Sequence, residues 1–263
     1  MKFYLTIITI VLFAAKSYSQ ESTPLNSSRP GQAFTPLTAG KGTLQLQTGL
    51  NISETYVKGF SEYDFVSFNS NSLVRYGISD KIEVRAEMGW LRQQEGFNAD
   101  RTLLDRITNV SVGSRIALIR DEDSGQYLSF QQMIDKPIID IPFLGGSELQ
   151  LLLAYMRPLI GEVTLTVNTG FAIDVEYGGS YSNYVLNLSF PINDQLGGFV
   201  ENYGVIDSDE VFVSWDAGLA LTLGRNVQID LSGGFGKIPD IVLDDTRQWF
   251  VDSGVSWRIL SKS

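Results

Sequence analysis

From Thr43 onward, apolar side chains alternate with polar ones instead of recurring every three or four residues. The clearest case is the stretch 82–90, where all five even positions, from Ile82 to Trp90, are apolar and no odd position carries an apolar side chain. Side chains of a β-strand point alternately to opposite faces, so this stretch predicts a strand with one apolar and one charged face. The same period of two returns in 44–52, 163–173, 184–190, 227–235 and 249–259.

The alternation predicts twelve strands along the chain. They lie near 43–52, 66–76, 82–91, 107–119, 127–134, 148–156, 162–173, 181–190, 196–205, 210–223, 227–236 and 247–259. Most have close to the ~9–11 residues with which a tilted strand crosses a membrane.

The links between these strands alternate in length. Tight links rich in turn residues follow every second strand, at 77–81, 121–126, 157–161, 191–195 and 224–226. The other links are mostly longer, as at 92–106, 135–147 and 237–246, with 206–209 as a short exception. This asymmetry is typical of bacterial outer-membrane proteins. We therefore expect an all-β fold, an antiparallel transmembrane β-barrel of about twelve strands with short periplasmic turns and longer extracellular loops.

The register of the first tight hairpin gives an internal check on this fold. Opposed side chains of a hairpin must share a face. Centring the turn on Ser79 pairs Val74 with Val84 and Arg75 with Glu83. The apolar pair then faces outward and the ion pair inward.

Two further hairpins obey the same rule. Centring the fourth tight turn on Asn193 pairs Leu186 with Val200. The fifth hairpin matches faces only with a three-residue turn, which pairs Leu223 with Val227.

The polar faces of the strands carry many charged side chains, which we expect to line the lumen. A soluble sandwich would present the same charges to water, but the even strand number, the loop asymmetry and the aromatic residues Tyr76, Trp90, Trp249 and Trp257 near strand ends favour a membrane barrel. The expected lumen-lining residues are Arg75, Glu83, Arg85, Glu87, Arg115, Glu201, Asp216, Asp230, Asp252 and Arg258.

The chain start has the pattern of a secretory signal peptide. Lys2 is followed by an apolar run over 3–15 and a small-residue cleavage site after Ser19, so residues 1–19 are expected to be removed after Sec-type export. As a membrane anchor the run is too short, since a bilayer span needs about 20 residues. Residues 20–42 contain Pro24, Pro30 and Pro36, which predicts an extended segment outside the sheet. It is either a free periplasmic tail or a plug in the lumen, and the barrel occupies 43–263.

The amino-acid composition excludes several classes of catalytic and metal-binding function. The 263 residues include no Cys and no His, which excludes disulfides, thiolate chemistry, Ser-His-Asp catalysis and most zinc sites. The net charge of -10 opposes nucleic-acid binding. No catalytic residue, cofactor site or metal site is predicted.

Two acidic stretches have other interpretations. Residues 121–125 weakly resemble a calcium loop but lack its remaining ligands, so a polar turn is favoured. Five acidic residues are expected on the outer rim, where divalent ions would bridge them to lipopolysaccharide phosphates or where they would simply be solvated: Asp207, Asp209, Glu210, Asp244 and Asp245.

Several short motifs, in order along the exported chain, resemble the outer-membrane transporter-like family of the MetA pathway of phenol degradation. They are RPG at 29–31, KGTLQ at 41–45 with TG at 48–49, LVRYG at 73–77, DKIEVR at 80–85, VG at 112–113 with Arg115, FVENYG at 199–204, DAGL at 216–219, NVQID at 226–230 and GVSWR at 254–258. The resemblance implies an outer-membrane barrel that transports small molecules, often hydrophobic or aromatic, and it supplies no catalytic set. Residues 260–263 depart from the terminal aromatic that the outer-membrane assembly machinery recognises in many barrels.

These observations favour a passive channel in the bacterial outer membrane, embedded in lipid and lipopolysaccharide, for a small solute that the sequence does not identify. Twelve strands predict a narrow lumen, in which Arg75, Glu83, Arg85, Arg115 and Arg258 would lie near one level and tune selectivity. The excess of inward acids favours cations or neutral polar molecules. A structural or surface-interaction barrel with a filled lumen is the alternative. An outer-membrane enzyme fits least, since barrel lipases and proteases rely on a His base.

Overall fold

The computed structural model describes residues 25–57, 60–95, 102–138, 146–207, 210–237 and 246–260. Within these ranges no helix is long and apolar enough to cross a membrane. The strands are β1 (Thr43–Val57), β2 (Phe60–Gly77), β3 (Ile82–Glu95), β4 (Thr102–Asp121), β5 (Gln126–Pro137), β6 (Glu148–Ile160), β7 (Val163–Asp174), β8 (Ser180–Pro191), β9 (Leu196–Asp207), β10 (Glu210–Leu223), β11 (Val227–Lys237) and β12 (Thr246–Leu260). The expected signal peptide, residues 1–19, lies outside the described residues.

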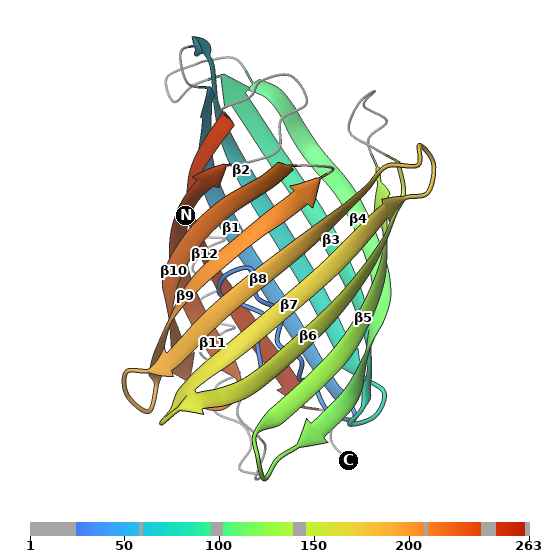
Figure 1. Ribbon diagram of the computed structural model, residues 1–263, viewed down its shortest axis with the longest axis vertical. Helices are drawn as coiled ribbons and strands as arrows, with labels where there is room; N and C mark the ends of the chain where they lie inside the picture. Colours follow the sequence, from blue (N-terminus) through green and yellow to red (C-terminus); the bar gives the residue numbers. More distant parts are fainter. Residues whose placement is uncertain are drawn as a thin grey trace, which may run out of the picture.

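The strands form one closed antiparallel barrel (Figure 1). Each strand pairs with its neighbours in the sequence, and β1 pairs with β12 over the full length of both. Closure leaves no unpaired edge, as a sheet in a lipid bilayer requires. The prediction of an all-β, twelve-stranded barrel is confirmed.

Polar and apolar positions are distributed in the opposite way to a soluble protein. The largest fully buried side chains are mostly polar and include Arg75, Arg115 and Glu83, whereas Val84 and Met88 are 41% and 43% exposed on the outer surface. In a soluble sandwich the charged face would be the exposed one, so that alternative is wrong. An apolar exterior around a polar interior is the arrangement of a barrel that faces lipid.

Several strands continue farther into the longer links than predicted. β1 reaches Val57 and β2 begins at Phe60, which leaves only residues 58–59 between them. β4 starts at Thr102, five residues before the expected start. The apolar alternation marks only the part of a strand that needs a lipid-facing side, whereas the backbone hydrogen-bond ladder continues beyond it.

Two predicted registers are wrong by two residues. The first hairpin pairs Val74 with Ala86 and Arg75 with Arg85, not with Val84 and Glu83. The cause lies in the turn, where the Ser79 hydroxyl accepts hydrogen bonds from the backbone N–H groups of residues 81 and 82 and moves the centre of the hairpin one residue along. Because the shift is even, every side chain keeps its face.

The fourth hairpin repeats this turn chemistry. The Asn193 side chain accepts hydrogen bonds from the N–H groups of residues 195 and 196. Leu188, not Leu186, therefore lies opposite Val200. In the fifth hairpin, Leu223 pairs with Val227 as predicted, so the three-residue turn is confirmed.

The stretch at 121–125 is a turn that its own side chains close. Asp121 accepts hydrogen bonds from the N–H groups of Asp123 and Ser124 and from the Ser124 hydroxyl. Gly125 has a φ of 65°, in the left-handed region. The interpretation as a polar turn is confirmed for this stretch.

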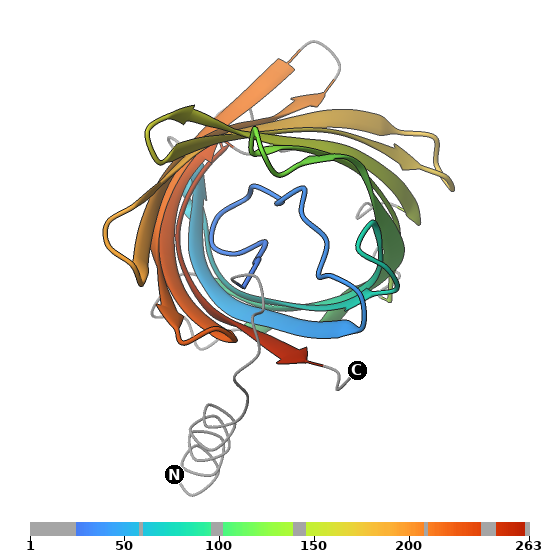
Figure 2. The ribbon, with the colours of Figure 1, turned by 90° about the horizontal axis from the view of Figure 1, so that it is seen from below.

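Residues 25–42, here called the lumen segment, run inside the barrel, where Figure 2 shows them as the blue trace enclosed by the strands. The segment leaves the lumen at the tight-turn end, where the Gly42 N–H donates to the Gly77 carbonyl at 2.8 Å. Of the two alternatives for the N-terminal region, residues 25–42 therefore correspond to a plug in the lumen and not to a free periplasmic tail.

Candidate functional site in the barrel lumen

Two groups of opposite charge line different parts of the barrel wall. The first, the arginine cluster, comprises Arg75 on β2, Glu83 and Arg85 on β3, and Arg115 on β4. The second, the acidic cluster, comprises Glu201 on β9, Asp216 on β10, Asp230 on β11 and Asp252 on β12.

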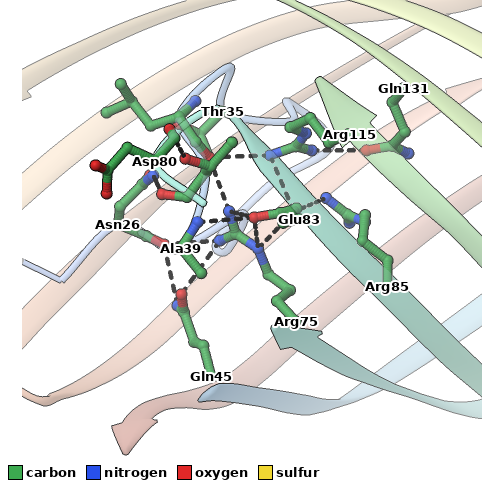
Figure 3. Close-up of polar contacts among 12 residues, drawn as sticks. Asn26, Thr35, Ala39, Gln45, Arg75, Asp80, Glu83, Arg85, Arg115 and Gln131 are labelled. Atoms are coloured by element: carbon green, nitrogen blue, oxygen red, sulfur yellow. Dashed lines mark hydrogen bonds and ion pairs between the residues drawn. The ribbon is translucent and has the colours of Figure 1, made fainter. Parts of the chain in front are cut away.

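The arginine cluster has three guanidinium groups around one carboxylate (Figure 3). Arg75 Nη2 lies 2.9 Å from Glu83 Oε2, while Arg85 Nη1 and Arg115 Nη1 lie 3.2 and 3.9 Å from Glu83 Oε1. All four side chains are buried. The predicted Arg75–Glu83 ion pair therefore forms, although the two residues are diagonal neighbours and not directly opposed.

The surplus positive charge binds backbone carbonyls of the lumen segment. The Leu37 carbonyl accepts from Arg75 Nη2 at 2.8 Å and from Arg115 Nη1 at 3.2 Å, and the Asn26 carbonyl accepts from Arg75 Nη1 at 2.8 Å. Glu83 Oε2 in turn accepts the Ala39 N–H at 2.8 Å. Such charge-assisted hydrogen bonds are stronger than neutral ones, so this wall fixes the tight-turn end of the segment.

Glu201 fixes the middle of the lumen segment from the opposite wall. Its two carboxylate oxygens accept the successive N–H groups of Gln32, at 2.6 Å, and Ala33, at 3.0 Å. Gly31, with a φ of 83°, makes this approach possible, since a Cβ there would lie 2.6 Å from the same carboxylate. Asp216 lies directly opposite Glu201 in the strand register.

Arg29 carries the only positive side-chain charge that the described part of the lumen segment places against the acidic cluster. Its guanidinium donates to Asp230 Oδ1 from Nε at 3.2 Å and from Nη2 at 3.0 Å, and it also donates to Asp252. Burial lowers the pKa of the Arg29 guanidinium, but the carboxylates of Asp230 and Asp252 outweigh this effect and raise the pKa above its ordinary value. Arg29 is therefore a permanent cation in the lumen.

A third contact lies between the two charged walls. The Phe34 N–H donates to Asn168 Oδ1 at 2.7 Å, and Asn168 Nδ2 donates back to the Phe34 carbonyl at 3.0 Å. The Phe34 ring lies 5.6 Å from the Arg85 guanidinium carbon. The segment thus contacts β3, β7, β9, β11 and β12 within a few residues.

The structure places the ten predicted lumen residues on the inner face of the barrel. Eight are buried, while Glu87 and Asp252 are half-buried. Glu87 accepts a hydrogen bond from Asn71. Arg258 was expected near the arginine cluster, but its guanidinium instead donates at 2.6 Å to the Arg225 carbonyl in the β10–β11 turn.

Sequence reasoning missed the partners of these charges. Arg29 and Gly31 lie in the RPG motif, where the resemblance offered a signal without a role. Nothing in the sequence indicated the contact of Asn168 with the lumen segment, apart from the position of Asn168 on the polar face of its strand. Of the rim acids, Glu210 lies opposite Asp207 at the end of the β9–β10 hairpin, and Asp209, Asp244 and Asp245 lie outside the described residues.

The lumen segment separates cavities along the barrel. A cavity of about 440 Å³ on the tight-turn side is lined by Arg29, Phe199 and residues of the β8–β9 turn. A second, of about 220 Å³, is lined by Arg29, Gln32, Phe34, Glu87 and Asp252. Among the described residues no cluster of acidic side chains has the arrangement of a metal site.

The comparisons with known proteins identify a fold but no family. No family model matches the chain, and no curated protein matches it. The resemblance to the MetA-pathway family therefore stays a prediction.

Among solved structures, an outer-membrane channel from Pseudomonas putida F1 superposes with a TM-score of 0.66 at 8% identity, over 88% of this chain and 100% of that one. The NanC porin gives a TM-score of 0.55 at 9% identity, over 80% and 100%. The KdgM porin, in complex with a disordered oligogalacturonate, gives 0.51 at 7% identity, over 80% and 98%. The chain has the fold of an outer-membrane β-barrel.

Proposed function

We propose that the protein is a passive outer-membrane channel for small polar solutes, and that its lumen segment must move aside for solutes to pass. The observation that carries this proposal is the division of one polar lumen into cavities by a segment that is not part of the sheet. The lining is rich in charges and amides, which favours polar solutes over the hydrophobic ones that the family resemblance implies. Export by residues 1–19 and contact with lipid and lipopolysaccharide belong to the same proposal.

The lumen segment can act as a gate only if it can move out of the path of the solute. The polar contacts of the lumen segment described above are hydrogen bonds and ion pairs to side chains of the barrel wall. The net contribution of such a hydrogen bond to stability is about 0.5–1.5 kcal/mol, or about 1.5–3 kcal/mol with a charged partner. Displacement of part of the segment therefore costs little compared with opening the barrel, whose backbone ladder is closed.

One pair of residues allows a direct test of this movement. The hydroxyls of Ser27 on the segment and Ser256 on β12 lie 2.6 Å apart, so Ser27→Cys with Ser256→Cys places two thiols within bonding reach. The chain has no native Cys, so no other disulfide can form within it. Because residue 42 leads directly into β1, the disulfide ties both ends of the segment to the wall.

We expect the reduced double variant to conduct ions in planar bilayers and the oxidised one to lose most of that conductance, with recovery on reduction. The single Ser27→Cys variant is the control and should not respond to the oxidant. Equal conductance of the oxidised and reduced forms would refute the movement of the segment. Absence of any conductance in wild type and reduced variant would refute the channel itself.

The structure also favours a second candidate, a structural or surface-interaction barrel with a filled lumen. The observation behind it is the number of opposing walls that bind the segment, including Glu201, Asn168 and the arginine cluster. A filled barrel predicts no conductance in any of these variants together with a high unfolding temperature, so the same bilayer measurement separates the two functions.

A further inference from the structure

The Arg29 side chain lies in a recess of the barrel wall, here called the guanidinium notch, which consists of Gly49, Asp230, Asp252 and Gly254. Gly49 and Gly254 face each other across the β1–β12 pair. A Cβ on either glycine would overlap the Arg29 guanidinium. The two missing side chains therefore leave a space that this planar group fills.

The carboxylates of the notch have more acceptor capacity than Arg29 uses. Both Arg29 bonds to Asp230 go to Oδ1, whereas Asp230 Oδ2 is buried and has no hydrogen-bond partner among the described residues. Asp230 is 3% exposed. A buried carboxylate oxygen without a partner is costly, so the notch favours a cation with several N–H donors.

The Asp252 side of the notch borders a cavity of the lumen. Asp252 and Arg29 line the cavity of about 220 Å³, and the other residues around this cavity include Asn71 and Glu87. The residues that line this cavity include two carboxylates, those of Glu87 and Asp252, and one basic side chain, that of Arg29. The acidic cluster has four carboxylates against the single Arg29, so the potential at the notch favours a further positive charge.

We infer that the guanidinium notch is a binding site for small solutes that carry a guanidinium group, and that Arg29 occupies it as a tethered competitor. A guanidinium presents a planar fork of donors that matches carboxylates, which a compact ammonium group does not. Binding of such a solute releases the Arg29 side chain, which is one of the contacts that hold the lumen segment. The link from binding to opening rests on the proposed channel function, whereas the binding itself does not.

Because Arg29 is covalently attached to the chain beside the notch, the affinity of the notch for free solutes must be measured in its absence. A side chain attached close to its site acts at an effective concentration in the millimolar range or above, so free solutes bind weakly while Arg29 is present. Arg29→Ala removes the competitor and leaves the glycines and carboxylates in place. Arg120→Ala is the matched control, since Arg120 pairs with Glu122 in an exposed position near the β4–β5 turn.

The test is calorimetric titration of the full mature chain, folded in detergent, with methylguanidinium. We expect Arg29→Ala to bind one equivalent at least about tenfold more tightly than wild type or Arg120→Ala. Tetramethylammonium, which has no N–H donor, should not bind, and methylammonium should bind at least tenfold more weakly. Adding Asp230→Asn to Arg29→Ala should weaken methylguanidinium binding by a further tenfold or more.

Equal binding of methylguanidinium and tetramethylammonium would overturn the inference, because it would indicate a non-specific attraction to acidic residues. So would binding that persists with Asp230→Asn. Should Arg29→Ala not fold, Gly254→Ala tests the notch by filling it, and should abolish weak binding to the wild-type chain. Gly197→Ala is its control, since a Cβ there meets its nearest atom at an ordinary 3.6 Å.

Conductance distinguishes this inference from the proposed function. If methylguanidinium binds Arg29→Ala but neither Arg29→Ala nor the wild-type chain conducts, the notch is established and the channel is refuted. If the protein conducts but no guanidinium binds, the channel stands and the notch is refuted.

Discussion

Glu83 is the only carboxylate among the three arginines of the described arginine cluster, so Glu83→Gln is the most informative single change in the lumen. Glutamine has the same shape and retains one acceptor oxygen for the Ala39 N–H. The substitution therefore removes charge without opening a cavity. It leaves Arg75, Arg85 and Arg115 buried without the carboxylate that they share.

The magnitude follows from burial. Glu83 is 0% exposed, and removing one partner of a buried ion pair costs about 3–5 kcal/mol. The carbonyl of Leu37 still accepts from two of the arginines, so we expect a value near the lower limit, about 3 kcal/mol. With a denaturant slope of about 3 kcal/mol/M, the urea midpoint falls by about 1 M. Glu122→Gln, in the exposed pair with Arg120, should cost less than about 1 kcal/mol.

The assay is reversible urea unfolding in detergent or lipid, followed by tryptophan fluorescence. A second variant tests the cause. Arg85 Nε and Nη2 have no hydrogen-bond partner within the described ranges, so Arg85 gains least from its other neighbours. Glu83→Gln combined with Arg85→Gln should be more stable than Glu83→Gln alone. A single variant within 0.5 kcal/mol of wild type, or a double variant that loses the sum of both single effects, would refute the electrostatic explanation.

Three further outcomes are expected. A cysteine at Val84 should react with lipid-phase probes and one at Glu87 only with water-soluble reagents; the reverse pattern would place the strand one residue out of register. Arg85→Gln should shift the reversal potential across a salt gradient toward cations, and an unchanged potential would show that the cluster does not affect permeation. Gly77→Ala should loosen the base of the lumen segment and lower the unfolding temperature, because its Cβ would overlap the Gly40 carbonyl, whereas an unchanged temperature would contradict this contact.

The fold was predictable because a membrane barrel imposes a local rule on every strand. Each lipid-facing side chain must be apolar, so the alternation in stretches such as 82–90 determines which face is which without any knowledge of neighbours. Turn residues then separate the strands. An even shift in register leaves faces unchanged, which is why Glu83 and Arg85 were placed inward even though the residue predicted directly opposite Arg75 was wrong.

The registers themselves depended on turn geometry that alternation does not contain. In both misplaced hairpins a side chain at the second turn position, Ser79 or Asn193, binds the N–H groups that follow it and recentres the turn. Strand ends were missed for a related reason. Outside the apolar band the ladder needs no outward apolar residue, so β1 and β2 continue without the pattern that revealed their central parts.

The contents of the lumen were decided only by the tertiary structure. The sequence predicted an extended segment over 20–42 and placed six acids and four arginines on the inner face, but a segment with three prolines has the same local preferences in water as inside a barrel. Its position depends on contacts between residues far apart in the chain, such as Arg29 with Asp230 and Phe34 with Asn168. These contacts exist only once the barrel has closed, because closure brings β12 against β1 and forms the notch between Gly49 and Gly254.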